Sequence, residues 1–235
     1  MNDKKRLFTK DVEKMRKKVV AFVPIKLNSQ RLANKNILPI GDHPLSWYVF
    51  SNLLRIKKID EVYVFCSDEN VMNYVPKGVN FLKRDRLLDG DLVKGNEIYQ
   101  AFINMIDSDI YLLAHTTSPF MTHTSIENAL ENVLSENYDS ALSVQKKQTF
   151  VWYKAQTLNY ECDDIPRTQD IEPIYIETSG FYIFKKDHFL THGRRIGFNP
   201  YFQELDDIEA IDIDTKDDYE YALKIIEMDK HLQKV

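Results

Sequence analysis

The sequence predicts an α/β fold built around a mostly parallel β-sheet. Short apolar runs that are typical of buried strands alternate along the chain with segments of helical periodicity. Strands that alternate with helices pair in parallel and are joined by right-handed crossovers. A length of 235 residues fits one large domain, or one domain with a substantial insertion, and is enough to bury a full core.

Six short runs are expected to form strands of this sheet. The first, 19–23, is the continuous apolar run VVAFV, and a polar loop follows it directly. The others are 61–66, 80–83, 109–114, 140–144 and 209–213.

Helices are expected between these runs, at 45–55, 95–106, 124–136 and from 216 to about 231. The first helix carries an apolar stripe at helical spacing, formed by Trp47, Val49, Phe50, Leu53 and Leu54. Ser125 is a candidate N-cap of the third helix, and 67–70 has the composition of a further helix start.

The pattern changes after Val144. Residues 145–185 contain strand-like pieces and turn residues but few helical stripes, and 148–154 and 174–184 are expected to form antiparallel ribbons. The segment is either an insertion that packs against a partner subunit or a plain excursion on the surface, and the residues alone leave both open. The expected organisation is an N-terminal arm, 1–18, followed by one domain, 19–235.

Composition excludes several classes of protein. The chain is 43% hydrophobic and 29% charged, as is usual for a globular protein, and its net charge of -5 argues against a general nucleic-acid binder. Cys66 and Cys162 do not form a metal-ligand pattern. No apolar run approaches the ~18 residues of a membrane span, and the charged start of the chain lacks the apolar region of a signal peptide. A reducing cytoplasm is therefore the expected compartment.

The polar loop after the first expected strand is the strongest candidate for a binding site. It carries the cations Lys26, Arg31 and Lys35 and the polar residues Asn28, Ser29 and Asn36. Ligands of open α/β sheets bind outside the carboxyl ends of the strands, and Lys and Arg suit phosphate groups. We interpret the loop as a triphosphate grip, with a solvated basic loop as the alternative. The glycine patterns of a Walker A loop and of a dinucleotide-binding loop are both absent.

Two carboxylates near the end of the chain, Asp212 and Asp214, are candidate metal ligands. In a strand, residues two apart point to the same face. A carboxylate pair together with nucleotide phosphates is a usual arrangement for Mg²⁺. The structural alternative is that Asp214 merely caps the final helix.

Further polar residues follow other expected strands. Arg84 comes directly after 80–83, while His115, Thr117 and Ser118 follow 109–114. A solvated strand edge, a packing histidine and an ordinary turn explain these residues as well. Two more polar stretches contain Arg167, Gln169 and Thr178, which charged surface loops explain as readily.

Taken in order, these segments resemble the acylneuraminate cytidylyltransferase family, which includes CMP-sialic acid and CMP-3-deoxy-octulosonate synthetases. Its members activate 3-deoxy-2-keto sugar acids as their CMP esters. The resemblance runs from about Val19 to Leu223 and rests on six motifs, at 24–36, 67–68, 81–84, 117–119, 167–175 and 211–215. Each motif alone is modest, but six in the right order are specific.

The resemblance implies a Rossmann-like three-layer nucleotidyltransferase fold. It also implies that CTP and a sialic-acid-like nonulosonate or an octulosonate give a CMP-sugar and pyrophosphate, with Mg²⁺ as cofactor. The ribbon within 145–185 would serve dimerisation and reach the neighbouring active site of a homodimer. Neither nucleic acid nor a membrane is an expected partner.

The roles that the resemblance implies fall into four groups. Lys26, Arg31 and Lys35 hold the phosphates, and Asp212 and Asp214 hold Mg²⁺. Asn28, Ser29, Asn36, Arg84, Thr117 and Ser118 bind the nucleotide. His115, Arg167, Gln169, Tyr175 and Thr178 face the sugar acid.

Several residues depart from the family pattern. Lys26 stands in place of the usual Arg, and Arg31 lies where enzymes for the eight-carbon acid carry an arginine. Leu27 and Asn28 replace two glycines of the sialate-type loop, and His115 replaces a Gln that faces the sugar acid. Nucleotide and metal positions are retained while sugar-facing positions differ, which supports cytidylyl transfer and points away from the standard sialic acid.

Two other interpretations remain open. A cytidylyltransferase for a phosphonate, a phosphate ester or a sugar 1-phosphate would suit the extra cations and His115. A nucleotide-binding protein that has lost catalysis is the alternative outside the enzymes, although intact Lys35, Asp212 and Asp214 argue against it.

Overall fold

A computed structural model of the chain describes residues 16–27 and 32–228. Most of the arm expected at 1–18 therefore lies outside the described residues. The same holds for residues 28–31 of the first loop, which include the predicted site residues Asn28, Ser29 and Arg31.

The main sheet of the described residues has seven strands in the order β11-β7-β10-β6-β1-β4-β5. Four parallel strands form one half, namely β1 (Val19–Pro24), β4 (Glu61–Cys66), β5 (Asn80–Lys83) and β6 (Ile110–Ala114). The other half consists of β10 (Ile174–Lys185), β7 (Ser140–Lys147) and β11 (Pro200–Glu204). β10 runs antiparallel to both its neighbours, whereas β7 and β11 are parallel.

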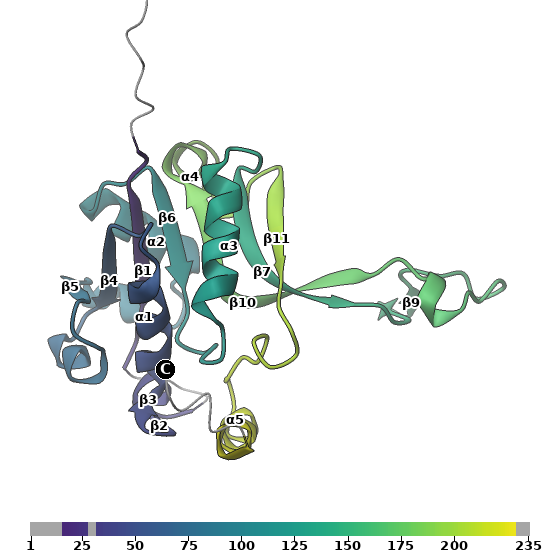
Figure 1. Cartoon of the computed structure of the whole chain (residues 1–235), viewed down its shortest axis with the longest axis horizontal. Helices are drawn as coiled ribbons and strands as arrows, with labels where there is room; N and C mark the ends of the chain where they lie inside the picture. Colours follow the sequence, from purple (N-terminus) through teal and green to yellow (C-terminus); the bar gives the residue numbers. More distant parts are fainter. Residues whose placement is uncertain (1–15, 28–31, 229–235) are drawn as a thin grey trace, which may run out of the picture.

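Helices cover both faces of the sheet. Alternate residues of β1 point to opposite sides, so that Ala21 packs among residues of α1 (Leu45–Arg55) and α3 (His123–Leu134). Phe22 packs on the other face against α2 (Gly95–Met105), beyond which α4 (Lys186–His192) joins the same core. Figure 1 shows α1 and α3 in front of the sheet. The predicted three-layer α/β fold with a mostly parallel sheet is confirmed.

Two expected details of the secondary structure are wrong. The run 209–213 is not a strand, because turn hydrogen bonds from Ala210 and Ile211 to preceding carbonyls bend the chain, and the sheet edge is occupied by β11. Ser125 is not the cap of α3, since the Thr122 hydroxyl accepts the hydrogen bond from its backbone N–H. The helix start expected at 67–70 is confirmed, as the short 3₁₀ helix Glu69–Tyr74, which is capped by Asp68.

A long antiparallel ribbon projects from the sheet. β7 and β10 continue beyond it to the pair Lys147 and Ile174, and a two-stranded hairpin of β8 (Trp152–Tyr153) and β9 (Gln156–Thr157) lies beyond them. Figure 1 shows this arm reaching far from the rest of the molecule. The segment expected at 174–184 thus forms part of a ribbon, whereas only two residues of 148–154 are in a strand.

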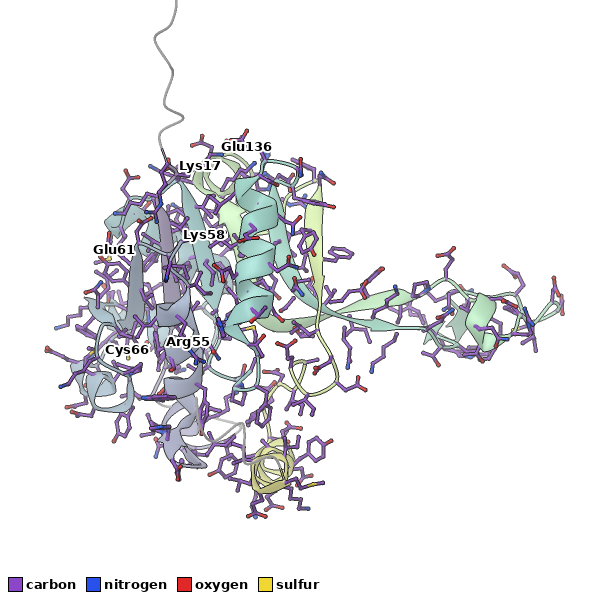
Figure 2. The ribbon with its side chains drawn as sticks, in the orientation of Figure 1. Lys17, Arg55, Lys58, Glu61, Cys66 and Glu136 are labelled. Carbon is purple, nitrogen blue, oxygen red and sulfur yellow. The ribbon has the colours of Figure 1, made fainter. Side chains whose placement is uncertain are left out.

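The carboxyl ends of the parallel strands meet at one edge of the sheet. Figure 2 labels Glu61 and Cys66, the first and last residues of β4, and so shows the strand direction. Near this edge lie the 3₁₀ helix η1 (Lys35–Ile37), the hairpin of β2 (Pro39–Ile40) and β3 (His43–Pro44), and α5 (Lys216–Met228). At the opposite edge, Lys17 forms a 2.6 Å ion pair with Glu136. Within 16–27 and 32–228, every helix is too short or too polar to cross a membrane.

Candidate active site

A cleft of about 400 Å³ opens at the carboxyl ends of the parallel strands. Four residues that the sequence singled out line it, Lys26 after β1, Lys35 in η1, Arg84 after β5 and His115 after β6. The first loop, Arg84 and His115 therefore belong to one site, because parallel strands bring their carboxyl ends together.

The opposite wall of the cleft consists of residues that the sequence analysis missed. They come from the loop after the 3₁₀ helix Arg86–Asp89 and from the start of α2, and they include Gly90, Asp91 and Tyr99. Lys26 Nζ lies 2.9 Å from Asp91 Oδ1, so an ion pair joins the two walls. The glycines at 90 and 95, between the expected strand 80–83 and the start of the expected helix 95–106, were a turn signal that could have located this wall.

Lys35 joins the cleft to the acidic pair. Its ammonium lies 2.8 Å from Asp214 Oδ1, and only 12% of the Lys35 side chain is exposed. The two residues are 179 positions apart in the chain. The basic loop and the acidic pair are thus parts of a single site.

Asp212 lies beside this ion pair in a partly buried position. Its Oδ1 is buried and has no hydrogen-bond partner among the described residues. Burial raises the pKa of the Asp212 carboxyl, and the nearby Asp214 raises it further, while a hydrogen bond from Thr117 and the charge of Lys35 oppose them. Thr117 also accepts a 2.8 Å backbone hydrogen bond from Ile213, so it anchors the acidic segment to the end of β6.

The two aspartates come together for a different reason from the one expected. They do not share the face of a strand, since the segment is irregular and follows a turn. Asp214 does not act as the cap of α5 either, because Thr215 Oγ1 accepts from the Asp218 N–H and Asp218 Oδ2 accepts from the Thr215 N–H. The carboxylate of Asp214 is directed to Lys35 instead.

The acidic pair fits a hard divalent cation. A buried carboxylate oxygen without a hydrogen-bond partner is an available ligand, and Mg²⁺ prefers oxygen. In the part of the chain that the structure describes, no three His, Cys, Asp or Glu side chains gather as a complete metal site. A set of two carboxylates suits a Mg²⁺ ion that also binds substrate phosphates and water.

Arg84 and Asn36 hold the floor of the cleft together. The Arg84 side chain is 2% exposed, and its Nη2 donates to the carbonyl of Ile25 at 2.9 Å and to Asp89 Oδ1 at 2.5 Å. Asn36 donates to the carbonyl of Lys26 at 2.7 Å, and its Oδ1 accepts from Thr116 Oγ1 at 2.5 Å. Both side chains thus fix the first loop, and their contact with nucleotide stays a prediction.

His115 has a hydrogen-bond partner at one ring nitrogen and a lowered pKa. Burial lowers the pKa of its imidazole, and the charges of Arg195 and Lys35 act in the same direction. Nδ1 lies 2.5 Å from the carbonyl oxygen of Ser179, at an irregularity in β10. Because a carbonyl can only accept, the neutral ring donates from Nδ1, which leaves Nε2 as a hydrogen-bond acceptor.

This lowered pKa predicts a pH-dependent contribution to stability. The unfolded chain binds a proton at His115 more readily than the folded chain does, so the stabilisation is complete above about pH 6.5 and declines as the pH falls below that value. His115→Gln is expected to reduce the loss of unfolding free energy between pH 7 and pH 5, by at most about 1.4 kcal/mol per pH unit. Urea unfolding at several pH values measures this, with the partly exposed His123→Gln as control. Identical pH profiles for His115→Gln and the unmodified protein would contradict it.

The remaining predicted residues lie in two regions. Ser118 is buried, with no hydrogen-bond partner for its Oγ among the described residues, and Thr178 donates to Ser143 Oγ at 2.7 Å. Arg167, Gln169 and Tyr175 lie on the ribbon and do not line the cleft of their own chain. The Arg167 side chain is 73% exposed and pairs with Asp170 at 2.6 Å.

The chain matches a family model described as cytidylyltransferase over residues 20–234. It is 25% identical over 237 residues to the N-acylneuraminate cytidylyltransferase of Escherichia coli O18:K1:H7, covering 94% of this chain and 55% of the relative. It is 23% identical over 207 residues to the pseudaminic acid cytidylyltransferase and UDP-2,4-diacetamido-2,4,6-trideoxy-beta-L-altropyranose hydrolase of Helicobacter pylori, covering 83% of this chain and 40% of that protein. The chain spans about half the length of the curated N-acylneuraminate cytidylyltransferases that it matches.

Among solved structures, the fold is similar to that of a CMP:2-keto-3-deoxy-manno-octonic acid synthetase complexed with CTP. The TM-score is 0.65 at 15% sequence identity, and the match covers 90% of this chain and 99% of that one. This likeness supports the fold, and the family model covers nearly the whole chain. The chain belongs to the cytidylyltransferase family.

Proposed function

We propose that this protein transfers CMP from CTP to a 3-deoxy-2-keto sugar acid and releases pyrophosphate. The observation that carries the proposal is the Lys35–Asp214 ion pair, which joins a basic cleft to a partly buried carboxylate pair. A nucleoside triphosphate and its divalent cation need these two kinds of group side by side.

The cations of the cleft would position the nucleotide. Lys26 and Lys35 would contact its phosphates, together with Arg31, which lies outside the described residues. The anomeric hydroxyl of the acceptor would attack the α-phosphorus, and the bond to the pyrophosphate oxygen would break. Transfer of this kind is accelerated mainly by positioning the reactants and neutralising their charge.

Asp212 and Asp214 would hold Mg²⁺. When bound there, the ion would neutralise phosphate charge and stabilise the departing pyrophosphate. Lys35 would keep the Asp214 carboxylate in place.

The acceptor would bind near His115. The neutral imidazole offers Nε2 as an acceptor for a sugar hydroxyl. Arg167, Gln169 and Tyr175 would contribute from the ribbon of a second subunit in a homodimer. Exposed apolar side chains on the ribbon, including Trp152, Leu158 and Ile165, support such an interface. A monomeric mass by light scattering would contradict this arrangement.

Pyrophosphate release from CTP with a panel of acceptors tests the function. We expect release with a 3-deoxy-2-keto sugar acid, and its loss when Mg²⁺ is removed with EDTA or when UTP replaces CTP. Release only with a phosphonate, a phosphate ester or a sugar 1-phosphate would change the acceptor class. CTP binding without release from any acceptor would favour a non-catalytic nucleotide-binding protein.

A further inference from the structure

A second cavity adjoins the cleft. It has a volume of about 450 Å³ and shares Gly95 and Tyr99 with the cleft. Its described lining also contains three basic side chains, Lys94, Arg194 and Arg195, and no carboxylate. A cavity with this charge, open beside a substrate cleft, is suited to an anion.

Arg195 is held rigidly at this cavity. Its Nη1 donates to Tyr99 Oη at 2.7 Å, and its guanidinium lies 3.6 Å from the centre of the Tyr182 ring. The nearest carboxylate, Glu177, is 3.9 Å from Nη2 and also accepts a hydrogen bond from Tyr182 Oη at 2.8 Å. An arginine fixed against aromatic rings loses little further conformational entropy when it binds an oxyanion.

The two other cations surround the same space. Arg194 donates from Nε to the carbonyl of Ile196 at 2.5 Å and from Nη2 to that of Gly197 at 3.0 Å, which fixes its guanidinium in the loop. Lys94 is exposed and forms no ion pair within the described ranges. Neither cation is neutralised by a neighbouring carboxylate of the lining.

The cavity is electrostatically connected to the proposed acceptor position. The Tyr182 ring that supports Arg195 lies 6.2 Å from the His115 ring, centre to centre. The charge of Arg195 is also one of the causes that lower the pKa of His115. His115 also lines the cleft, which shares Gly95 and Tyr99 with the basic cavity, so a molecule bound at His115 can extend toward that cavity.

We propose that this cavity binds a second oxyanion of the acceptor, in addition to the carboxylate of the sugar acid. The group would be a phosphate, a phosphonate or a further carboxylate, which Arg195 can bind through its planar fork and Lys94 as a point charge. This inference rests on the proposed function and specifies its substrate class.

Steady-state kinetics with paired acceptors test this proposal. Two pairs are used. Each contains a 3-deoxy-2-keto sugar acid and the same acid with an added anion, which is a phosphate ester in one pair and a carboxylate in the other, so the pairs show which anion the cavity prefers. Arg195→Gln is expected to raise the KM of the anion-bearing acceptor by about tenfold more than that of its partner. Lys94→Gln, an exposed change that leaves the packing intact, should act in the same direction. Arg55→Gln, at the exposed end of α1, is the matched control.

Equal KM increases for both acceptors of a pair, or an increase confined to CTP, would overturn the proposal. A binding measurement separates it from the proposed function. Inorganic phosphate titrated into the CTP-saturated protein should shift the amide resonances of Gly95, Asn96 and Ile196, and Lys94→Gln and Arg195→Gln should abolish the shifts. These shifts would support the cavity even if no acceptor reacted, and their absence would count against it even if the sugar acid reacted.

Discussion

Asp212→Asn is expected to lower turnover by on the order of a hundredfold or more. The change removes one negative charge from a carboxylate whose buried Oδ1 has no hydrogen-bond partner among the described residues, and it preserves the shape of the side chain. Binding of CTP to the cations of the cleft and the fold itself should be largely kept. Pyrophosphate release at saturating CTP and acceptor measures the effect over a range of Mg²⁺ concentrations.

The matched control is Asp217→Asn, which alters an exposed carboxylate in the first turn of α5. It should leave turnover unchanged. If Asp212→Asn retained full turnover at saturating Mg²⁺, the metal role of the acidic pair would be rejected.

Arg84→Met should destabilise the protein by about 3–5 kcal/mol, the usual cost of removing one partner of a buried ion pair. The substitution leaves the carbonyl of Ile25 without its donor and the Asp89 carboxylate without its cation. Arg84 Nε has no hydrogen-bond partner among the described residues, so burying this donor costs free energy. Methionine removes that cost, which would make the destabilisation smaller. Urea unfolding followed by circular dichroism measures the change.

Arg86→Met provides the comparison, because Arg86 is exposed and lies two residues further along. Its effect should stay within about 0.5 kcal/mol. Equal stabilities of the two variants would show that the buried hydrogen bonds of Arg84 do not hold the floor of the cleft.

The sequence predicts the central strands and helices well because their burial patterns are strong. The runs at β1, β4 and β6 are almost fully buried, and the apolar stripe of α1 repeats at helical spacing. The segment 209–213 misleads because alternating apolar and acidic residues are also compatible with an irregular chain that packs Ile213 inward. The edge strand β11 was missed because it is short, begins with proline and is only partly buried.

Part of the site could be predicted because the sheet is mostly parallel. Lys26, Arg84 and His115 could be grouped because each follows a strand at the same edge of the sheet. The sequence analysis placed Lys35 and Asp214 at one nucleotide site, since a metal-bound triphosphate needs both cations and carboxylates. It expected a strand to position Asp214, whereas the structure does so with an irregular segment after a turn. Arg195 had no such signal, because it enters from the loop after α4 and no local motif links it to the ends of the strands.

The long separation between Lys35 and Asp214 has a consequence for biosynthesis. During translation the parallel strands β1, β4, β5 and β6 leave the ribosome first, and the acidic half of the site follows only with residue 214. Packing of α5 against the hairpin of β2 and β3 then secures that segment. A chain that ends before residue 214 would carry the described cations of the cleft without the carboxylate that pairs with Lys35, so it would be expected to lack the complete site.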